Sequence, residues 1–439
     1  MNYRKAIDYL NSFINYERKK RFAYNEFRLK RVKRILKLLG DPHEGIKAIH
    51  IAGTKGKGST AVFISSILRA AGFKIGLYTS PHLHDFRERI KVNGRLINKK
   101  DLVSLTRHLK GVIDRYINKN KDLPTFFEVY TILAFCYFRL KRIDLMVIEA
   151  GLGGRLDATN VIKPLVCVIT PISYEHMDKL GRTLSKISRE KAGIIKGRTI
   201  VISATQPKTV LDVIKETARK KRARLYIVGK DILFETNKIN AKYQLFTVQG
   251  IFARYCRLKT FLLGKHQLIN AASGIGTVEA LRFYNININS SAIKKGINKA
   301  RWAGRMEKVS ERPLIILDGA QNKASALALK SAIQTIFNYK RLILVLGIFR
   351  DKDIKGICSE LERISDRIIL TQTTHPRAAS VAYLKRFISD GKVVHTRESL
   401  RDAIELALRK AKDEDLILVT GSLFTVGEAR AIIKISKDV

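Results

Sequence analysis

Short runs of Val, Ile and Leu recur along the chain, and longer segments with helical periodicity separate them. Each run is almost continuously apolar, which is typical of a strand buried on both faces of a parallel sheet. The segments between them include amphipathic stretches such as residues 398–411, ESLRDAIELALRKA. This alternation predicts an α/β fold built on parallel sheets. The runs expected to form strands are residues 46–53, 74–80, 143–150, 164–173, 199–203, 313–320, 341–348, 367–373 and 415–422.

Two segments interrupt this alternation. Residues 229–259 alternate apolar and polar side chains, which predicts a hairpin at an antiparallel edge. Around residues 298–313 the only tryptophan, a glycine and a proline break the pattern, and a new strand–helix series begins at Pro313. We therefore predict an N-terminal domain over residues 1–298, a linker over 299–312 and a C-terminal domain over 313–439.

Composition limits the class of protein. The chain has 439 residues, of which 46% are hydrophobic, enough for more than one domain with a sizeable core. We find no apolar run near the roughly 20 residues that span a membrane and no signal-peptide pattern at the start. The four cysteines are far apart without paired spacing, which favours a reducing, cytoplasmic setting over disulfides or a metal site.

The formal net charge is +44. Such a charge is compatible with nucleic-acid binding. However, the basic residues are spread over the whole chain, and no aromatic-studded basic motif accompanies them. We favour a compositional bias, with a basic surface that also attracts anionic substrates.

The segment HIAGTKGKGST, residues 50–60, lies between an expected strand and a helical pattern. Glycines let backbone N–H groups approach an anion, and the following helix adds its positive dipole end. Its lysines supply mobile positive charge. The segment therefore predicts a phosphate-binding loop, although its spacing differs from the general nucleotide-binding pattern. The alternative is an ordinary glycine-rich strand-to-helix turn.

Polar residues follow three of the expected strands. Ser80, Glu149 and His176 should share the sheet edge that carries the phosphate-binding loop, because ligands bind beyond the carboxyl ends of parallel strands. A hydroxyl, a carboxylate and an imidazole beside phosphate suit Mg²⁺, and Mn²⁺ could substitute because of the histidine. Singly, Ser80 could be a turn residue before Pro81, Glu149 a cap and His176 a surface histidine.

Several motifs occur in order along the chain: HIAGTKGKGST, YTSPHL, IEAGLGGRLDATN, HMDKLGRTLSKISREKAGIIK, GKHQLINAA, RWAGRMEKV, LDGAQN, DKD and GSLFTVGEAR. Together they resemble the folylpolyglutamate synthase/dihydrofolate synthase family within the Mur ligase superfamily. The resemblance covers nearly the whole chain. It implies an N-terminal P-loop ATP-binding domain with a parallel sheet and a smaller, Rossmann-like C-terminal α/β domain.

The resemblance also implies an activity. Family members use ATP to phosphorylate a carboxyl group of a pteroate or folate, and the amino group of L-glutamate then displaces phosphate. The substrate carboxylate and the γ-phosphate of ATP are both anions and repel each other when they meet. Cations must offset this repulsion, which fits a lysine-rich loop and Mg²⁺. A cell-wall Mur ligase and, less favoured, a nucleic-acid-binding ATPase remain alternatives. We expect a monomer without membrane or nucleic-acid partners.

The family's functional positions carry over to this chain as follows. Lys57, Lys191 and His176 match catalytic positions, and Lys191 matches a lysine that is carbamylated to hold a second metal beside Ser80, Glu149 and His176. A surface salt-bridge lysine is the alternative for Lys191. The implied ATP contacts are Gly53, Thr54, Lys55, Gly56, Lys57, Gly58, Ser59, Thr60, Asn270, Arg305 and Asp318.

Two further regions match substrate positions. The pterin-substrate region corresponds to Thr125, Phe126, Phe127, Glu128, Leu156, Asp157 and Ala158. For residues 125–128 a helix N-terminus with core aromatics is the equal alternative. Gln321 and Ser422 match the glutamate side.

The chain departs from the family pattern at three places. Lys55 stands where the family usually has Asn, and Glu175 where it has Asp before the histidine. Gln321 and Lys323 replace a histidine and a proline. Gln321 can donate a hydrogen bond but cannot titrate near neutral pH, which bears on the second half-reaction and on amino-acid preference.

Overall fold

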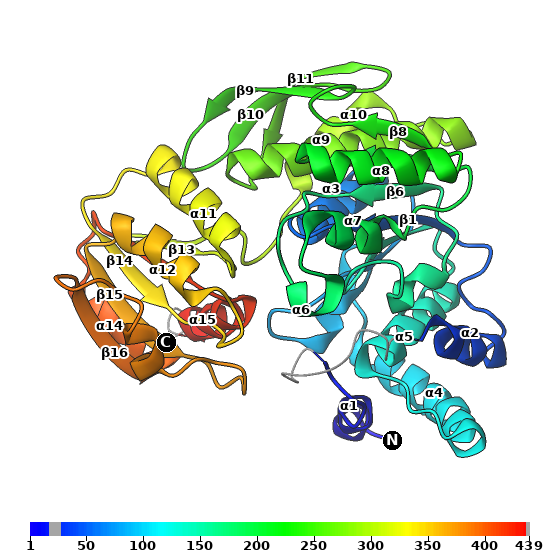
Figure 1. The fold of residues 1–439 in the computed structure, drawn as a ribbon, viewed down its shortest axis with the longest axis horizontal. Coiled ribbons are helices and arrows are strands. Elements are labelled where there is room, and N and C mark those ends of the chain that lie inside the picture. The colour runs from blue at the N-terminus through cyan, green and yellow to red at the C-terminus, as the bar shows by residue number, and fades with distance from the viewer. Residues whose placement is uncertain (17–27, 436–439) are drawn as a thin grey trace.

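The computed structural model describes residues 1–16 and 28–435. Two α/β units form the molecule, and the C-terminal one lies beside the larger N-terminal one (Figure 1). All nine apolar runs form strands, and the expected α/β fold is confirmed.

The N-terminal unit is built on one eight-stranded sheet. Its strands pair in parallel, except that β3 pairs antiparallel with β2 and the edge strand β4 pairs antiparallel with β3. The carboxyl ends of β1, β2, β5 and β6 therefore meet at one edge, as the sequence predicted. In spatial order the strands are β4 (Arg95–Leu96), β3 (Ile90–Val92), β2 (Ile75–Tyr78), β5 (Leu145–Glu149), β1 (Lys47–Ala52), β6 (Val166–Ile169), β7 (Ile200–Ser203) and β8 (Arg224–Ile227).

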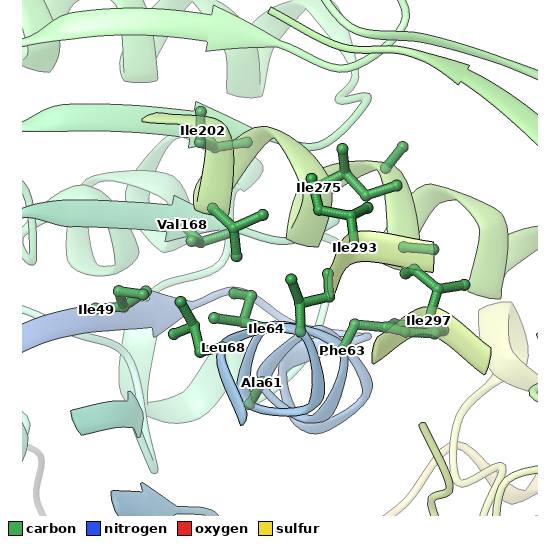
Figure 2. Close-up of a cluster of buried hydrophobic side chains, with 14 of the residues drawn as sticks. Ile49, Ala61, Phe63, Ile64, Leu68, Val168, Ile202, Ile275, Ile293 and Ile297 are labelled. Atoms are coloured by element: carbon green, nitrogen blue, oxygen red, sulfur yellow. The ribbon is translucent and has the colours of Figure 1, made fainter. Parts of the chain in front are cut away.

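The helix that follows the phosphate-binding loop is at the centre of the main core. In α3 (Lys57–Ala70), buried residues occur all round the helix, because it packs between the sheet and two further helices, α9 (Lys265–Ala280) and α10 (Ser290–Lys299). Figure 2 shows Ile64 and Leu68 of α3 among Ile49 of β1, Ile275 of α9 and Ile293 of α10. This packing fixes the start of α3, and with it the loop.

Helices also cover the opposite face of the sheet. One cluster joins Ala48, Tyr78 and Ile148 to helices near the N-terminus, and another joins Cys167 and Ile169 to α7 and α8. These helices are α1 (Tyr3–Asn11), α2 (Leu29–Leu38), α4 (Lys99–Asn120), α5 (Phe126–Leu140), α6 (Met177–Leu180), α7 (Leu184–Ala192) and α8 (Lys208–Lys220), with the short 3-10 helices η2 (Phe86–Arg89) and η3 (Ala158–Val161). A further 3-10 helix, η4 (Leu281–Tyr284), follows α9 and packs in the main core.

The segment expected at an antiparallel edge forms a separate sheet instead. Strands β9 (Leu233–Ile239), β10 (Gln244–Gln249) and β11 (Arg254–Thr260) pair only with one another among the described strands. Its apolar residues Phe246, Val248 and Leu258 pack into the same core as α3 and α9. The hairpin pattern was therefore interpreted correctly, but its placement was wrong because packing on α9 replaces pairing with the main sheet.

The C-terminal unit has a six-stranded sheet with helices on both faces. Its strands are β12 (Glu307–Glu311), β13 (Leu314–Leu317), β17 (Leu416–Thr420), β14 (Leu342–Leu346), β15 (Arg367–Gln372) and β16 (Val393–Ser399). Its helices are α11 (Lys323–Ile336), α12 (Ile354–Leu361), α13 (Val381–Lys385), α14 (Leu400–Lys410), α15 (Leu423–Ile435) and η5 (Glu362–Ile364). Strand β12 pairs antiparallel with β13, so residues 307–311 of the predicted linker belong to this sheet.

The two units contact each other through the loop after β2 and helix α15. A Cβ atom added at Gly427 would overlap the carbonyl oxygen of Leu83, and one at Gly304 would lie 3.0 Å from Val426. The rings of His82 and Phe424 are also in edge contact, 6.5 Å apart. The close approach at Gly427 leaves no room for a side chain.

Among residues 1–16 and 28–435, none of the helices combines the length and apolar character that crossing a bilayer requires.

Candidate active site

The loop between β1 and α3 has a backbone that only glycine accommodates at two positions. Gly53 has φ 148° and Gly56 has φ 83°, both in the region that disfavours side chains. A Cβ atom at Gly53 would overlap Thr170, and one at Gly56 would overlap the Asn270 amide. Lys57 begins α3, whose first N–H groups have no acceptor within the helix. The loop thus directs helix-end amides and a lysine toward one point, which suits an anion.

Glu149 lies beside this loop, at the end of β5. Its side chain is 4% exposed, and its Oε1 is 3.9 Å from Nζ of Lys57. Its Oε2 accepts a hydrogen bond of 3.2 Å from the backbone N–H of Ser80. Burial raises the pKa of Glu149, and the positive charges of Lys57 and Arg305 only partly oppose this. A buried carboxylate with such loose partners is suited to binding a cation.

Lys191 approaches the same loop from α7. Its Nζ donates a hydrogen bond of 2.8 Å to the carbonyl oxygen of Gly53, and the residue is 4% exposed. Burial and the neighbouring charge of Lys57 lower the pKa of Lys191 to about 7, against an opposing effect of Glu175. A buried lysine with an accessible neutral form differs from the surface salt-bridge residue that was the alternative.

Lys55 and Glu175, two residues that differ from the family pattern, contact each other. Nζ of Lys55 donates a hydrogen bond of 3.0 Å to Oε1 of Glu175. Nζ of Lys352, from the C-terminal unit, lies 3.8 Å from the same oxygen. Burial tends to raise the pKa of Glu175, but Lys55, His176 and Lys352 outweigh it and lower that pKa, so the carboxylate is ionised.

His176 follows Glu175, has a left-handed backbone with φ 52°, and is exposed. Among the described residues, no hydrogen bond or ion pair joins His176 to Ser80 or Glu149. Within that part of the chain no three His, Cys, Asp or Glu side chains converge as metal ligands. A metal here would depend on the Ser80 hydroxyl, on water and on phosphate, as Mg²⁺ commonly does.

The residues matched to nucleotide contacts come from three elements. Asn270 of α9 is buried against Gly56 and donates from Nδ2 to Gln267, 3.0 Å away. Asp318 follows β13, and its two oxygens accept from the N–H groups of Met306 and Ala320. Arg305 lies near both Asp318 and Glu149 and affects the pKa of each carboxylate. Arg305 therefore approaches Glu149 of the N-terminal unit from the segment that connects the two units.

Comparisons with known proteins decide the family. Residues 51–278 match the Mur ligase middle domain, and residues 304–423 match the Mur ligase glutamate ligase domain. The dihydrofolate synthase/folylpolyglutamate synthase of Bacillus subtilis is 36% identical over 92% of this chain and 95% of its own length. The chain belongs to the dihydrofolate synthase/folylpolyglutamate synthase family of Mur ligases. The resemblance found in the sequence is confirmed, and with it the class of ATP-dependent ligases that form carbon–nitrogen bonds.

Solved structures of the family have the same fold. The folylpolyglutamate synthase of Mycobacterium tuberculosis complexed with ADP is 31% identical, with a TM-score of 0.90 over 98% of both chains. E. coli FolC in complex with DHPP and ADP is 29% identical, with a TM-score of 0.87 over 100% of this chain and 99% of that one. The predicted N-terminal ATP-binding fold and C-terminal α/β fold are thereby confirmed.

In this family member the segment 125–128 forms the start of α5. Thr125 caps the helix through the backbone N–H of Glu128, and Glu128 accepts in turn from the N–H of Thr125. Glu128 is also paired with Arg31 through two bonds of 3.0 Å, and Phe126 is buried in the core. These are the contacts of the alternative interpretation, a helix N-terminus with core aromatics. Only Phe127 is partly buried, and its ring lies against Gly151.

Leu156 and Asp157 lie in the loop after β5, and Ala158 is the first residue of η3. Asp157 is buried and accepts hydrogen bonds from the N–H groups of Leu152 and Thr159. Burial raises the pKa of Asp157, while those hydrogen bonds lower it. Leu156 is partly buried and Ala158 is buried. Asp157 shapes this loop, and its role toward a pterin stays a prediction.

Gln321 and Ser422 lie at helix starts in the C-terminal unit. The N–H of Gln321 donates to Ser325 Oγ, 3.1 Å away, beside the capping residue Asn322. Lys323 is then the first residue of α11, a position that also accepts proline, so this departure preserves the helix start. Ser422 is buried and its Oγ accepts from the N–H of Thr425 in α15. Their roles toward glutamate stay predictions.

The sequence alone assigned no role to Lys352, although this lysine is part of the DKD motif. Only the arrangement of the two units places this lysine against Glu175. The only indication in the sequence was that this lysine stands between two aspartates, and this does not predict that it contacts Glu175.

Proposed function

We propose that this chain is an ATP-dependent ligase that joins the amino group of L-glutamate to a carboxyl group of a pteroate or folate. ATP phosphorylates that carboxyl group first, and glutamate displaces phosphate from the acyl phosphate. The observation that carries the proposal is the convergence of Lys57 and Arg305 on the buried Glu149 beside the phosphate-binding loop. Relatives named for this activity support it over nearly the whole chain.

The charges around the loop fit this chemistry. Lys55, Lys57 and Lys191 come from the N-terminal unit, and Lys352 comes from the C-terminal unit. A carboxylate and a triphosphate repel each other, and fixed cations that face both lower the barrier to phosphoryl transfer. The ADP complexes of relatives support an ATP site at this loop in the present chain.

We propose that Ser80, Glu149 and His176 hold Mg²⁺, with Mn²⁺ as a substitute. Glu149 supports this because its oxygens have only a 3.2 Å hydrogen bond and a 3.9 Å lysine contact. When bound, the ion would offset negative charge on the phosphate oxygens. Lys191 is proposed to be carbamylated: its neutral amine adds to dissolved CO₂, an N–C bond forms, and one proton leaves to solvent. The resulting carbamate is a carboxylate-like group beside Gly53, and the burial of Lys191 and its proximity to the loop support this.

The test is product analysis. Purified protein is incubated with ATP, Mg²⁺, L-glutamate and either dihydropteroate or tetrahydrofolate, and glutamylated product and ADP are measured by mass spectrometry and a coupled assay. Lys57→Ala is the negative control, because its side chain serves the loop and is not part of the core, and we expect about a 100-fold loss or more. ADP formation that needs a UDP-linked precursor, or that responds to DNA or RNA instead, would overturn the proposal.

A further inference from the structure

The turn that carries Lys352 is held on both sides by acidic residues. Asp351 accepts from Nε of Arg377, 3.0 Å away, and Asp353 Oδ1 accepts from the N–H of Gly356, 2.9 Å away, which caps α12. Lys352 lies between these anchors, and its side chain is 11% exposed. The turn therefore fixes the direction of a lysine that solvent hardly reaches.

Glu175 is tied to the phosphate-binding loop. The N–H groups of Thr54 and Lys55 both donate to the carbonyl oxygen of Pro171, at 3.0 and 3.1 Å. The Thr54 hydroxyl also donates to the carbonyl oxygen of Ser173, 3.2 Å away. The loop after β6 and the phosphate-binding loop thus form one hydrogen-bonded unit, and Glu175 belongs to it.

One oxygen of Glu175 contacts both lysines. Oε1 accepts from Lys55 at 3.0 Å and lies 3.8 Å from Nζ of Lys352. Glu175 is 11% exposed, so water screens this contact less than it screens a surface ion pair. Removing Glu175 would leave two neighbouring lysine charges without compensation, which is costly, and removing Lys352 would leave Glu175 paired with Lys55 alone. An asparagine at position 55 would supply no positive charge to Glu175.

We infer that Lys352 is a positioning residue, which through Glu175 and Lys55 holds the C-terminal unit against the phosphate-binding loop. In this arrangement the loop's cations stay in place while substrates bound by the two units meet. The role rests on the proposed ligase function. The contact of Lys352 with Glu175 and Lys55, called here the Lys352 bridge, is a structural property that can be measured without turnover.

The kinetic test is a double-mutant cycle. The variants are Lys352→Met, Glu175→Gln and the two combined. Lys355→Met is the control, because Lys355 is an exposed lysine at the start of α12, the helix that follows the turn. We expect each single change to lower kcat about tenfold with KM for ATP changed less than about twofold, and the double variant to be no worse than either. Lys355→Met should match the wild type.

The second readout is hydrogen exchange of the unliganded protein, followed by mass spectrometry. Lys352→Met should speed exchange of residues 53–58 and 171–176 at least about threefold, although the substitution lies in the other unit. Lys355→Met should leave those segments unchanged. The outcome that overturns the inference is losses that multiply in the double variant, or exchange that changes only in the turn around residue 352. If the wild type lacks folate-dependent ADP formation, the proposed function fails, and the exchange data still decide whether the bridge exists.

Discussion

Lys191 shows how one side chain takes its chemistry from its surroundings. Its amine donates to the carbonyl oxygen of Gly53 and lies in a field of other lysines, so burial and Lys57 lower its pKa to about 7. A carbamate forms only from a neutral amine, and this environment supplies that form at neutral pH.

We predict that Lys191→Ala is nearly inactive and that acetate partly restores turnover by occupying the vacated space. Lys191→Arg should stay inactive with acetate, because it keeps the positive charge and fills the space. Steady-state rates with and without acetate test this, with formamide as the neutral control. Full activity of Lys191→Ala without any carboxylate would rule out the carbamate.

His50, just before the phosphate-binding loop, is a second residue controlled by burial. Its Nε2 lies 2.8 Å from the Thr159 hydroxyl, which itself donates to Asp157 at 2.5 Å. Nε2 of His50 must therefore be the donor toward Thr159. Burial and Lys196 lower the pKa of His50 to about 3 from 6.5.

This shift predicts a loss of stability in acid. Below pH 6.5 the unfolded chain binds a proton that native His50 does not, so the free energy of unfolding falls as pH decreases from 6.5 toward 3. His50→Gln keeps a donor for Thr159 but does not titrate. We expect the wild type to lose about 1.4 kcal/mol more than His50→Gln between pH 7.5 and pH 5.5, measured by urea unfolding. Equal losses would contradict the assignment of a neutral, buried His50.

At the scale of elements, the crossing of α3 and α10 depends on a residue that weakens an isolated helix. Gly296 lies in the middle of α10, where glycine costs about 1 kcal/mol relative to alanine. A Cβ atom there would overlap the Ile67 backbone in α3, and the Ser66 hydroxyl donates to the carbonyl oxygen of Gly296 at 2.7 Å. Close contact of the two helices therefore outweighs helix propensity.

We expect Gly296→Ala to destabilise the protein by about 1–3 kcal/mol, as overpacking does, despite alanine's better propensity. Gly111→Ala in α4 is the matched control, because a Cβ atom there meets nothing within 4 Å. The control should gain about 0.5–1 kcal/mol. Thermal and urea unfolding measure the stability of both variants. A Gly296→Ala variant more stable than the wild type would contradict this prediction, because it would show that α3 and α10 can move apart without a loss of stability.

At the scale of the whole molecule, activity depends on how the two units meet. The carbonyl of Leu83, in the loop that follows Ser80, lies directly against Gly427 of α15. The same loop places the N–H of Ser80 on Glu149. A shift at this contact would therefore move the proposed metal ligands relative to the C-terminal unit.

Gly427→Ala should lower kcat at least tenfold, because misplacement by about 1 Å can cost about 100-fold in rate. Each unit keeps its own core, so we expect circular dichroism to be unchanged and small-angle scattering to detect a more open molecule. Gly111→Ala serves again as the control and should retain full kcat. Unchanged kcat in Gly427→Ala would mean that this contact does not set the catalytic geometry.

The strands of both sheets could be predicted because their signal is local. Nine apolar runs formed nine strands, whereas β3, β4, β8, β12 and β16 were not predicted. These five include the edge strands of both sheets and are short or largely exposed, so they lack a continuous apolar run. The signal for the loop between β1 and α3 was also local, since its glycines and lysines are adjacent in sequence.

Placement of the separate β9–β11 sheet and the partner of Lys352 required the tertiary structure. Alternation shows that a hairpin forms, but packing on α9 decides where it lies. Likewise, the sequence shows that Lys55 and Glu175 depart from the family pattern, but not that they contact each other and Lys352. By itself the sequence determined the α/β class, the glycine- and lysine-rich loop between β1 and α3, and the family, because periodicity and contiguous motifs encode them. Only the tertiary structure decided which charges meet across the two units, because such contacts join residues more than a hundred positions apart and depend on how complete domains pack.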